Sequence, residues 1–402
     1  MRNIRMALMC GWMILTLLPM SAKNFVAECG GHFLEFTVLD EDQKTCATYR
    51  VLESAVDPAS TSGTVKEVLV LPERVTDGED EYTIVSIGEK SFYHCQDIDI
   101  LILPETVTTI EYEAFHGSGI SSFHLPYGLR SIESSAFGCC MNLKAITIPP
   151  QITSLPRFAF DRCFNLEVCN MAGVSEIGDF AFDWCESLTL TGSLENLKQI
   201  GEGAFESCES ISTLDIPNVV EMGARAFNNC TGLTKIQIPS GMEKIEKECF
   251  RGCTSLSRID IPDNIERIET GAFRQCSSLE EITISPSVNA IGPYAFADCD
   301  DLSVINVNRP VPPTASLSSF SETTYHNARL IVPTESAGEY QVRNRIWSLF
   351  ANLETGMDEV NDIAYPTETG RYTTTGIPVD ANYKGLVLVR YADGSSRKVV
   401  VK

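Results

Sequence analysis

The sequence predicts a repeat solenoid, in a class between α/β and mainly β, built from about ten units of 22 or 23 residues. Three observations support this. A phenylalanine returns at that interval ten times, a cysteine follows it by three residues in nine units, and apolar residues flank both at constant offsets. A period between about 20 and 50 residues is typical of solenoids, because one unit cannot bury its apolar face without neighbours.

The two repeated positions define a structural ladder through the predicted core. Its rings are Phe92, Phe115, Phe137, Phe160, Phe182, Phe205, Phe227, Phe250, Phe273 and Phe296. Its thiols are Cys95, Cys140, Cys163, Cys185, Cys208, Cys230, Cys253, Cys276 and Cys299. Equivalent side chains on stacked coils run parallel at about 4.8 Å, whereas disulfides need converging side chains. We therefore expect the ladder thiols to be buried and free.

The other cysteines fall outside this ladder. Cys29 and Cys46 precede the repeats, and they could form one disulfide in the N-terminal region of an exported protein. Cys169 replaces an apolar strand residue and Cys249 replaces the alanine before a ladder phenylalanine, so we interpret both as core residues.

Each unit follows one internal plan, which the segment "LTKIQIPSGMEKIEKECFRGC" illustrates. Ile236 and Ile238 alternate as the inward residues of a short strand, and Pro239 ends it. A turn, Ile245 and a short helical stretch carrying Phe250 complete the unit. A strand plus a helix or 3₁₀ segment is the leucine-rich-repeat plan, with the strands stacked in parallel. The outward strand column is Ile102, His124, Thr147, Asn170, Gly192, Asp215, Gln237, Asp260, Thr283 and Asn306.

The N-terminal part divides into a leader and a cap. Residues 1–22 have a basic start, an apolar run and a small-residue exit at Ala22, which predicts a secretory signal peptide. Its alternative, a membrane anchor, is disfavoured because the run is short for a bilayer span. Residues 23–82 read as an N-terminal cap, with strands in "HFLEFTVLD" and "TVKEVLVLP". The repeat array follows at 83–308.

Two further segments close the chain. Residues 309–356 are predicted to form a C-terminal cap, with a strand in "ARLIVP" and a helix in "SAGEYQVRNRIWSLFANLE", where Ser336 and Glu339 have capping-box spacing. Residues 357–402 are predicted to form a small β segment that includes a hairpin with Asp393 and Gly394 at its turn.

The repeats resemble the BspA-like class of bacterial leucine-rich repeats. "IGEGAFESCESISTLDIP" and "IETGAFRQCSSLEEITIS" carry nearly all of the class motif, and the resemblance covers about residues 83 to 310. It implies a surface or secreted protein, often an adhesin for host matrix proteins or other bacteria. The final segment is similar to short C-terminal sorting modules of exported proteins, which implies sorting or anchoring.

Charge and motifs limit the other functions. The net charge of -23, without a basic stripe, argues against a nucleic-acid partner and against anionic membranes. No further segment could cross a membrane, and no catalytic motif or cofactor site is apparent. His94 and His116 could approach each other beside Cys139, and the segment "DGEDE" at Asp77 could hold calcium. We prefer a site without metal and a solvated turn, respectively.

These observations predict an exported binding or adhesion protein and not an enzyme. The partner is expected to be a protein or glycan, from host matrix or another bacterial surface. Two alternatives stay open: a surface hydrolase with a site in the terminal regions, and a purely structural surface spacer. The expected binding residues are Asn170, Asp215, Gln237, Asp260, Thr283 and Asn306.

Overall fold

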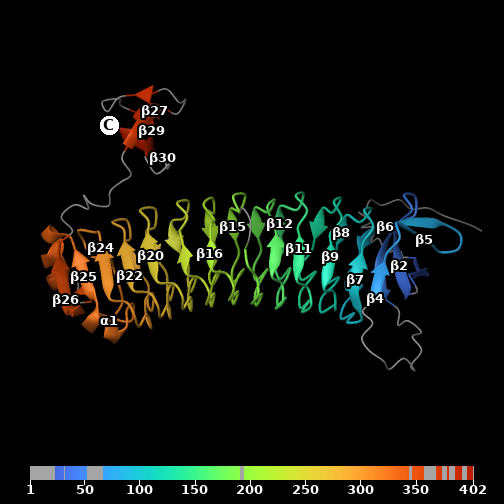
Figure 1. Cartoon of the computed structure of the whole chain (residues 1–402), viewed down its shortest axis with the longest axis horizontal. Helices are drawn as coiled ribbons and strands as arrows, with labels where there is room; N and C mark the ends of the chain where they lie inside the picture. Colours follow the sequence, from blue (N-terminus) through green and yellow to red (C-terminus); the bar gives the residue numbers. More distant parts are fainter. Residues whose placement is uncertain are drawn as a thin grey trace, which may run out of the picture.

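The chain forms an elongated solenoid of stacked coils (Figure 1). The computed structural model describes residues 23–30, 32–51, 67–190, 194–343, 346–356, 368–373, 378–379, 385–391 and 396–401. The predicted signal peptide at 1–22 lies outside these residues. Parallel strands recur at the sequence period, and helix is scarce in the described coils. The predicted solenoid class is therefore confirmed, at its mainly β end.

One side of the solenoid is a long parallel sheet, which we call the broad sheet. Its strands are β4 (Glu67–Val70), β7 (Ile98–Ile102), β9 (Ser122–His124), β11 (Ala145–Thr147), β13 (Val168–Asn170), β16 (Thr213–Leu214), β18 (Lys235–Ile236), β20 (Arg258–Ile261), β22 (Glu281–Ile284), β24 (Val304–Val307), β25 (Arg329–Val332) and β26 (Asn352–Thr355). Hydrogen bonding is continuous from β4 to β13, between β16 and β18, and from β20 to β26. The sheet thus extends beyond the predicted range of 83–308 at both ends.

A second parallel sheet, the narrow sheet, lies on another side of each coil. It begins with β6 (Glu81–Ile87), which also pairs with β5 (Arg74–Thr76). Its other strands have two residues each: β8 (Thr109–Ile110), β10 (Ser131–Ile132), β12 (Ser154–Leu155), β14 (Glu176–Ile177), β15 (Gln199–Ile200), β17 (Glu221–Met222), β19 (Lys244–Ile245), β21 (Arg267–Ile268) and β23 (Ala290–Ile291). Each of these two-residue strands ends in a buried apolar residue.

The helical stretch predicted in each unit is wrong, because a tight turn carries each ladder phenylalanine. In all ten units, the residues two positions before and two positions after the phenylalanine have φ between 52° and 73°. A right-handed helix requires negative φ, so these left-handed residues exclude it. The turns are joined across coils by backbone hydrogen bonds such as that from Phe205 N–H to the Ala226 carbonyl oxygen, 2.9 Å.

The ladder phenylalanines form one continuous stack between the two sheets. Successive rings lie 5.3 to 5.8 Å apart between centroids and are nearly parallel. Phe320 adds an eleventh ring, 5.4 Å from Phe296. The sequence prediction missed Phe320, because it follows Phe296 by 24 residues and lacks the cysteine three positions later. All eleven rings are buried, so the core is one layer of aromatic side chains running the length of the coils.

The ladder thiols are reduced and make their own hydrogen bonds. Eight of them, from Cys140 to Cys299, donate to the carbonyl oxygen of the phenylalanine one coil earlier, at 3.0 to 3.3 Å. Cys95 is only half-buried. Each buried thiol therefore satisfies a carbonyl group in the turn while it fills a small apolar space.

The N-terminal cap covers the first coil with an antiparallel meander. Its strands are β1 (Asn24–Cys29), β2 (His32–Asp40) and β3 (Thr45–Val51), and β3 pairs in parallel with β6 of the narrow sheet. Phe25 packs against Phe36 and Tyr82, with ring centroids 5.5 and 5.2 Å away. Cys29 and Cys46 are both buried in this cap as free thiols.

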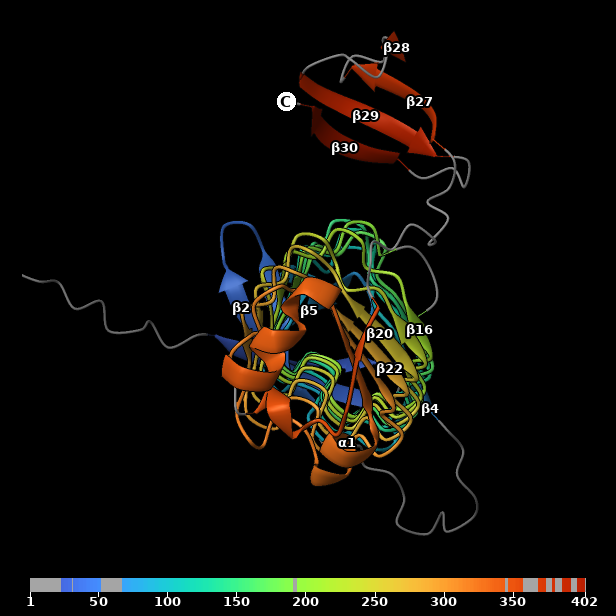
Figure 2. The ribbon, with the colours of Figure 1, turned by 90° about the vertical axis from the view of Figure 1, so that its left-hand side faces the viewer.

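The C-terminal cap closes the other end with short helical turns (Figure 2). The helix predicted over "SAGEYQVRNRIWSLFANLE" is found only in part. Residues 334–343 are helical without a break, a 3₁₀ turn follows at Trp347–Leu349, and the end of the predicted helix is instead the strand β26, which begins at Asn352. Ser336 lies within the first helical stretch and is not a helix cap. The helix α1 (Glu322–Asn327) precedes β25 and was not predicted.

The apolar residues of the predicted helix nevertheless reach the core. Trp347 and Tyr340 are fully buried, and the indole N–H of Trp347 donates to the Pro313 carbonyl oxygen at 2.8 Å. The ring of Phe320 meets the Trp347 ring edge-on, at a centroid distance of 5.8 Å. The cap thereby ends the phenylalanine stack with aromatic side chains that have found polar partners.

The last segment forms a separate antiparallel sheet of four strands. They are β27 (Glu368–Thr373), β28 (Pro378–Val379), β29 (Gly385–Tyr391) and β30 (Ser396–Val401), in the order β28-β27-β29-β30. β29 and β30 pair as the expected hairpin, and its turn with Asp393 and Gly394 lies outside the described residues. None of the helices in the described ranges has the length and apolar character needed to cross a membrane.

Candidate binding surface

The broad sheet holds the six expected binding residues on its outer side. Asp260, Thr283 and Asn306 are direct neighbours, because β20 pairs with β22 and β22 with β24 in that register. Asn170 ends β13, and the residue equivalent to it on the next coil, Gly192, lies outside the described residues. Asp215 and Gln237 directly follow β16 and β18. Four of the six side chains are exposed, and Thr283 and Asn306 are partly exposed.

The alternation of the strands explains why these residues face solvent. In β20 the buried residues Ile259 and Ile261 flank exposed Asp260, and the same order of burial recurs in β22 and β24. Successive side chains of a strand point to opposite faces, so a buried pair leaves the residue between them outside. The column therefore follows from the same periodicity that places the core.

A second outward column runs beside the first, two residues earlier in each strand. It contains Val68, Ile100, Ser122, Ala145, Val168, Thr213, Lys235, Arg258, Glu281, Val304, Arg329 and Asn352. The two columns together form a face two side chains wide, which we call the strand face. Sequence reasoning missed this second column as a surface, although its signal was present: it lies two positions before the first in every unit.

The strand face is apolar at its N-terminal end. Val68 and Val70 of β4 lie beside Ile100 and Ile102 of β7 in the paired register. Val68, Val70 and Ile102 are each about half exposed, at 51, 49 and 49%. Aliphatic side chains on adjacent strands form one contiguous patch, and such patches are typical of contact sites.

The middle of the strand face is small and uncharged. Ser122, Ala145 and Thr147 are exposed on β9 and β11, and Thr213 is exposed on β16. Small side chains leave the surface of the sheet flat, so a ligand can approach the strands closely there.

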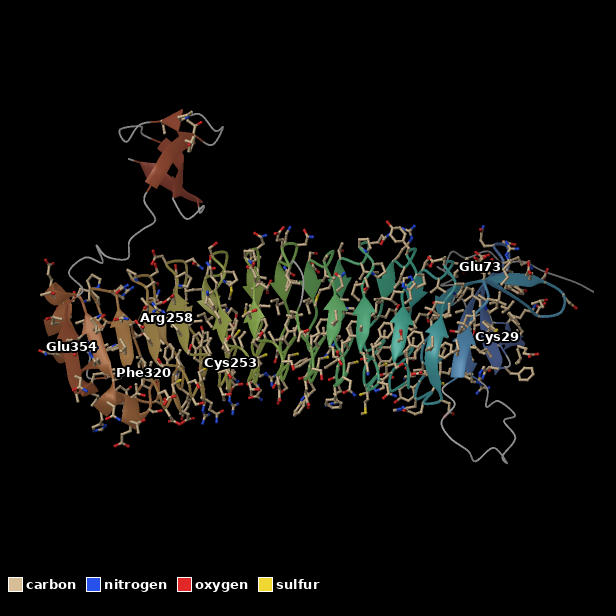
Figure 3. All side chains as sticks on the ribbon, in the orientation of Figure 1. Cys29, Glu73, Cys253, Arg258, Phe320 and Glu354 are labelled. Atoms are coloured by element: carbon tan, nitrogen blue, oxygen red, sulfur yellow. The ribbon has the colours of Figure 1, made fainter. Side chains whose placement is uncertain are left out.

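The C-terminal end of the strand face carries paired charges (Figure 3). Arg258 lies 3.4 Å from Asp260 and 3.3 Å from Glu281, and the Asn306 amide donates to Glu281 at 2.8 Å. Arg329 and Glu354 form a two-point pair at 2.8 and 2.6 Å. Arg329 holds the pKa of Glu354 below its usual value. Apart from the contact between Arg258 and Asp260 within β20, these contacts join different coils, so they could not be read from one repeat.

The expected binding residues therefore differ in whether their side chains already have hydrogen-bond or ion-pair partners in the protein. Asp260 and Asn306 are engaged with Arg258 and Glu281, and the Asn170 amide oxygen accepts from the Ala172 N–H at 3.4 Å. In the described residues, the side chains of Asp215, Gln237 and Thr283 make no hydrogen bond or ion pair with the protein. Of the six expected binding residues, these three are the ones that a ligand can contact without breaking an existing hydrogen bond or ion pair.

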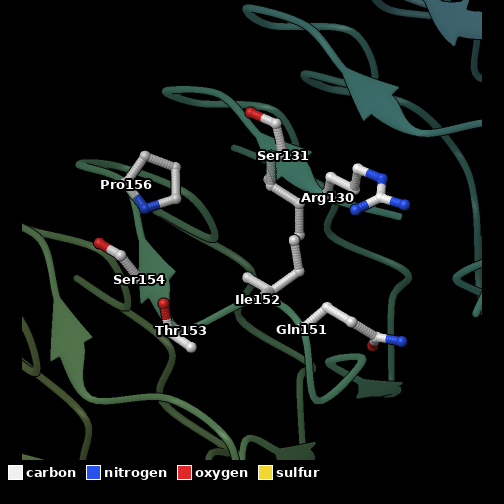
Figure 4. A pocket seen from close by; sticks show the side chains of 8 residues that line it. Arg130, Ser131, Gln151, Ile152, Thr153, Ser154 and Pro156 are labelled. Atoms are coloured by element: carbon white, nitrogen blue, oxygen red, sulfur yellow. The ribbon is translucent and has the colours of Figure 1, made fainter. Parts of the chain in front are cut away.

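A surface hollow lies on the opposite sheet, between β10 and β12 (Figure 4). Its lining residues are Arg130, Ser131, Ile132, Gln151, Ile152, Thr153, Ser154 and Pro156. None of them is a histidine, cysteine or carboxylate, so the lining offers no group suited to general acid or base catalysis near neutral pH.

The residues considered for metal binding do not converge. The rings of His94 and His116 lie edge to face, 5.9 Å apart between centroids, and Tyr93 stacks on His116. Within the described residues, no three histidine, cysteine or carboxylate side chains are placed to hold a metal ion. Asp77 of the "DGEDE" segment accepts the N–H groups of Glu79 and Asp80 and pairs with Lys23, which lowers the pKa of its carboxyl group.

The repeats match a known family model. The model of the BspA type leucine-rich repeat region matches residues 80–189 and 198–327, which is more than half of the chain, in six copies. The chain belongs to this family. The matched residues include all ten ladder phenylalanines, so the strand face from β7 to β24 is the outer surface of a BspA-type array.

Several solved leucine-rich-repeat structures are similar to this BspA-type chain at low sequence identity. A leucine-rich cell surface protein from Faecalibacterium prausnitzii is 22% identical, covering 70% of this chain and 94% of its own, with a TM-score of 0.35. A leucine-rich repeat protein from Bacteroides ovatus is 18% identical, covering 83% and 99%, with a TM-score of 0.39. The pneumococcal vaccine antigen PcpA is 15% identical, covering 82% and 96%, with a TM-score of 0.41. No curated protein matches the chain.

Proposed function

We propose that this chain is an exported protein, held at the cell surface or secreted, that binds a protein or glycan partner through the strand face. Membership of the BspA-type family supports the proposal, and one structural relative is described as a cell surface protein. The observation that carries it is the strand face itself: two columns of outward side chains, fixed in register by a parallel sheet.

The rigidity of the strand face is what suits it to binding. The side chains of Asp215, Gln237 and Thr283 project from or directly beyond strands whose neighbouring residues are buried. A partner that binds them has little further ordering to impose on the protein, which lowers the entropic cost of association. At about 4.8 Å per strand, a dozen strands give a face on the order of 55 Å long. That length fits a protein segment or glycan chain better than a small metabolite.

The composition of the face indicates what such a partner must offer. The patch around Val70 and Ile102 favours an apolar contact at one end, and the middle favours a flat polar one. The net charge of -23 favours a basic or neutral partner over an acidic one. A basic partner would bind more weakly as salt rises, because exposed charges are screened beyond a Debye length of about 8 Å at physiological ionic strength.

Two alternatives have less support from the described residues. A hydrolase in the terminal regions needs catalytic groups there. In the N-terminal cap, the lowered pKa of Asp77 is explained by the backbone N–H of Asp80, the ion pair with Lys23 and the backbone N–H of Glu79, and the raised pKa of Lys23 by its hydrogen bond to Asp77. A structural spacer needs no exposed apolar patch, whereas Val68, Val70 and Ile102 form one. Neither alternative explains why the patch lies on the ordered sheet.

A direct binding screen tests the proposal. The chain from about residue 23 onward is immobilised and exposed to extracellular-matrix proteins, mucin, a glycan array and intact bacteria. We expect saturable binding to at least one of these, competed by excess soluble chain. Turnover of a glycan or peptide substrate without stable binding would support the hydrolase, and the absence of both would support the spacer.

A further inference from the structure

A column of acidic residues lies in the turns of three successive coils. Asp161, Asp183 and Glu206 each directly follow a ladder phenylalanine, and we call them the acidic column. Backbone hydrogen bonds fix them beside one another: Arg162 N–H donates to the Asp183 carbonyl oxygen at 2.7 Å, and Trp184 N–H to that of Glu206 at 2.8 Å. The three acidic side chains are therefore held at the spacing of adjacent coils.

Two oxygens in this column are buried without a donor. Oδ1 of Asp161 and Oδ1 of Asp183 have no exposed surface and accept no hydrogen bond among the described residues. Asp161 as a whole is only 9% exposed. Glu206 is different, because its carboxylate accepts the Asn228 amide at 2.7 Å. A buried acceptor without a donor is costly, and an ionised one more so.

Positive charge near the column is too sparse to neutralise it. Arg162 reaches only the other oxygen of Asp161, Oδ2, at a long 3.5 Å. The groups that act on Asp183 are the carboxylates of Glu206 and Asp161, the guanidinium of Arg162 and the backbone N–H of Trp184, and the guanidinium of Arg225 acts on Glu206. The thiols of Cys185 and Cys208 lie close enough to interact electrostatically with Asp183, but burial raises their pKa values and keeps them protonated and uncharged.

We propose that Asp161 and Asp183 act as a proton-binding pair that makes these coils of the solenoid sensitive to pH. When a proton from solvent binds Asp183, its carboxyl O–H becomes the donor that the buried oxygen of Asp161 lacks. The same event removes one of two adjacent buried charges. When the proton leaves, both carboxylates are ionised side by side, and the turns that carry them are weakened.

The direction of the pH effect follows from the environment of Asp183. Burial, and then the charges of Glu206 and Asp161, raise its pKa to about 7, and burial also raises the pKa of Asp161. The folded state therefore keeps a proton that the unfolded chain releases above about pH 4. Stability is highest at acidic pH, falls as pH rises toward about 7, and levels off above it. His116 acts oppositely as pH falls below about 6.5, because burial lowers its pKa and the unfolded chain therefore takes up the proton first.

The test compares one isosteric variant with a matched control. Asp183→Asn mimics the protonated carboxyl at every pH and supplies an amide donor. Asp215→Asn removes the same charge from an exposed residue with no side-chain contacts in the described part. Urea unfolding of the full chain is followed from about pH 5 to about pH 8, where one bound proton changes the unfolding constant by up to about tenfold per pH unit.

We expect the wild type and Asp215→Asn to lose stability in parallel as pH rises toward 7. Asp183→Asn should lose less with pH and should be the more stable variant at about pH 8. Asp161→Asn provides a second variant with the same expectation. Hydrogen exchange of the wild type should show loss of protection around residues 157–186 as pH rises.

Two results would overturn the proposal. One is an Asp183→Asn profile parallel to that of the wild type, with no gain in stability at alkaline pH. The other is restoration of wild-type stability at alkaline pH by millimolar calcium alone, in a way that Asp183→Asn abolishes. That result would assign the column to a cation and not to a proton.

Discussion

At the residue scale, the turn of each coil depends on two left-handed positions. Only four of these positions are glycine: Gly117, Gly203, Gly252 and Gly271. At all the other positions a residue with a side chain has φ above 50°. Residues with a Cβ pay about 1–2 kcal/mol for this conformation. The sequence did not reveal it, because most of the positions do not show glycine, the usual signal of a left-handed turn.

Ser135→Gly tests whether this strain is real. Ser135 has φ of 58° and makes no side-chain hydrogen bond among the described residues, so glycine should relieve strain at little cost. We expect a change between neutral and about 1 kcal/mol of stabilisation in urea unfolding. Ser134→Gly, one residue away with no positive φ, is the control and should destabilise by about 0.5–1 kcal/mol. Equal destabilisation by both variants would refute the left-handed turn.

The aromatic stack makes the second prediction at this scale. Phe205 is 1% exposed and lies between the rings of Phe182 and Phe227, at 5.4 and 5.3 Å. Phe205→Ala should lower the free energy of unfolding by about 3–5 kcal/mol, since it leaves a cavity shared by three coils. Chemical denaturation measures the loss. A change below about 1 kcal/mol would mean that this ring does not support the core.

At the element scale, the periodicity predicted one sheet well and the other not at all. The broad-sheet strands were visible because inward residues such as Ile236 and Ile238 alternate with polar ones. The narrow sheet has two residues per strand, so it shows only one inward residue, such as Ile245, and no alternation. Its strands depend on hydrogen bonds between coils, which a single unit does not display.

The terminal elements were harder to predict for a related reason. Phe320 continues the stack after a 24-residue interval that includes "RPVPPTAS", so the period alone ends at Phe296. The predicted C-terminal helix has the right apolar residues, but residues 334–343 combine 3₁₀ and π-helical geometry, and the end of the predicted helix is strand β26. Packing of Tyr340 and Trp347 on the end of the stack overrides local helical preference.

The thiol ladder provides the prediction for this scale. Burial raises the pKa of the ladder thiol Cys299 to about 12 and also raises the pKa values of Cys185 and Cys208, so these thiols remain protonated and unreactive near neutral pH. Native protein should leave the thiols from Cys140 to Cys299 unmodified by an alkylating reagent, and unfolded protein should expose them all as free thiols. Mass spectrometry of both samples gives the answer. Disulfides between successive rungs would contradict the parallel geometry.

At the scale of the whole molecule, the solenoid converts a local repeat into a long ordered face. The positions of Asp215, Gln237 and Asp260 on that face follow from the period, which is why the sequence could predict them. The ion pair between Arg258 and Glu281, and the patch that joins Val70 to Ile102, follow from register between coils. Register is set by the stacking of the whole array, and no single repeat contains it.

If the partner binds the strand face, removal of exposed groups from that face must weaken binding more than removal of exposed groups elsewhere. The variant Asp215→Ala, Gln237→Ala, Thr283→Ala removes three unengaged groups of that face. The control Glu176→Ala, Gln199→Ala, Glu221→Ala removes three exposed groups of the narrow sheet. Exposed changes usually cost under about 0.5 kcal/mol each, so both proteins should fold.

Affinity of both variants is measured for the partner that the screen identifies, after circular dichroism and urea unfolding have shown an intact fold. We expect the strand-face variant to bind the partner at least about tenfold more weakly, which corresponds to a loss of about 1.4 kcal/mol in binding free energy. The affinity of the control should be unchanged. Unchanged affinity of the strand-face variant, or an equal loss in the control, would contradict binding at the strand face and move the binding site away from the broad sheet.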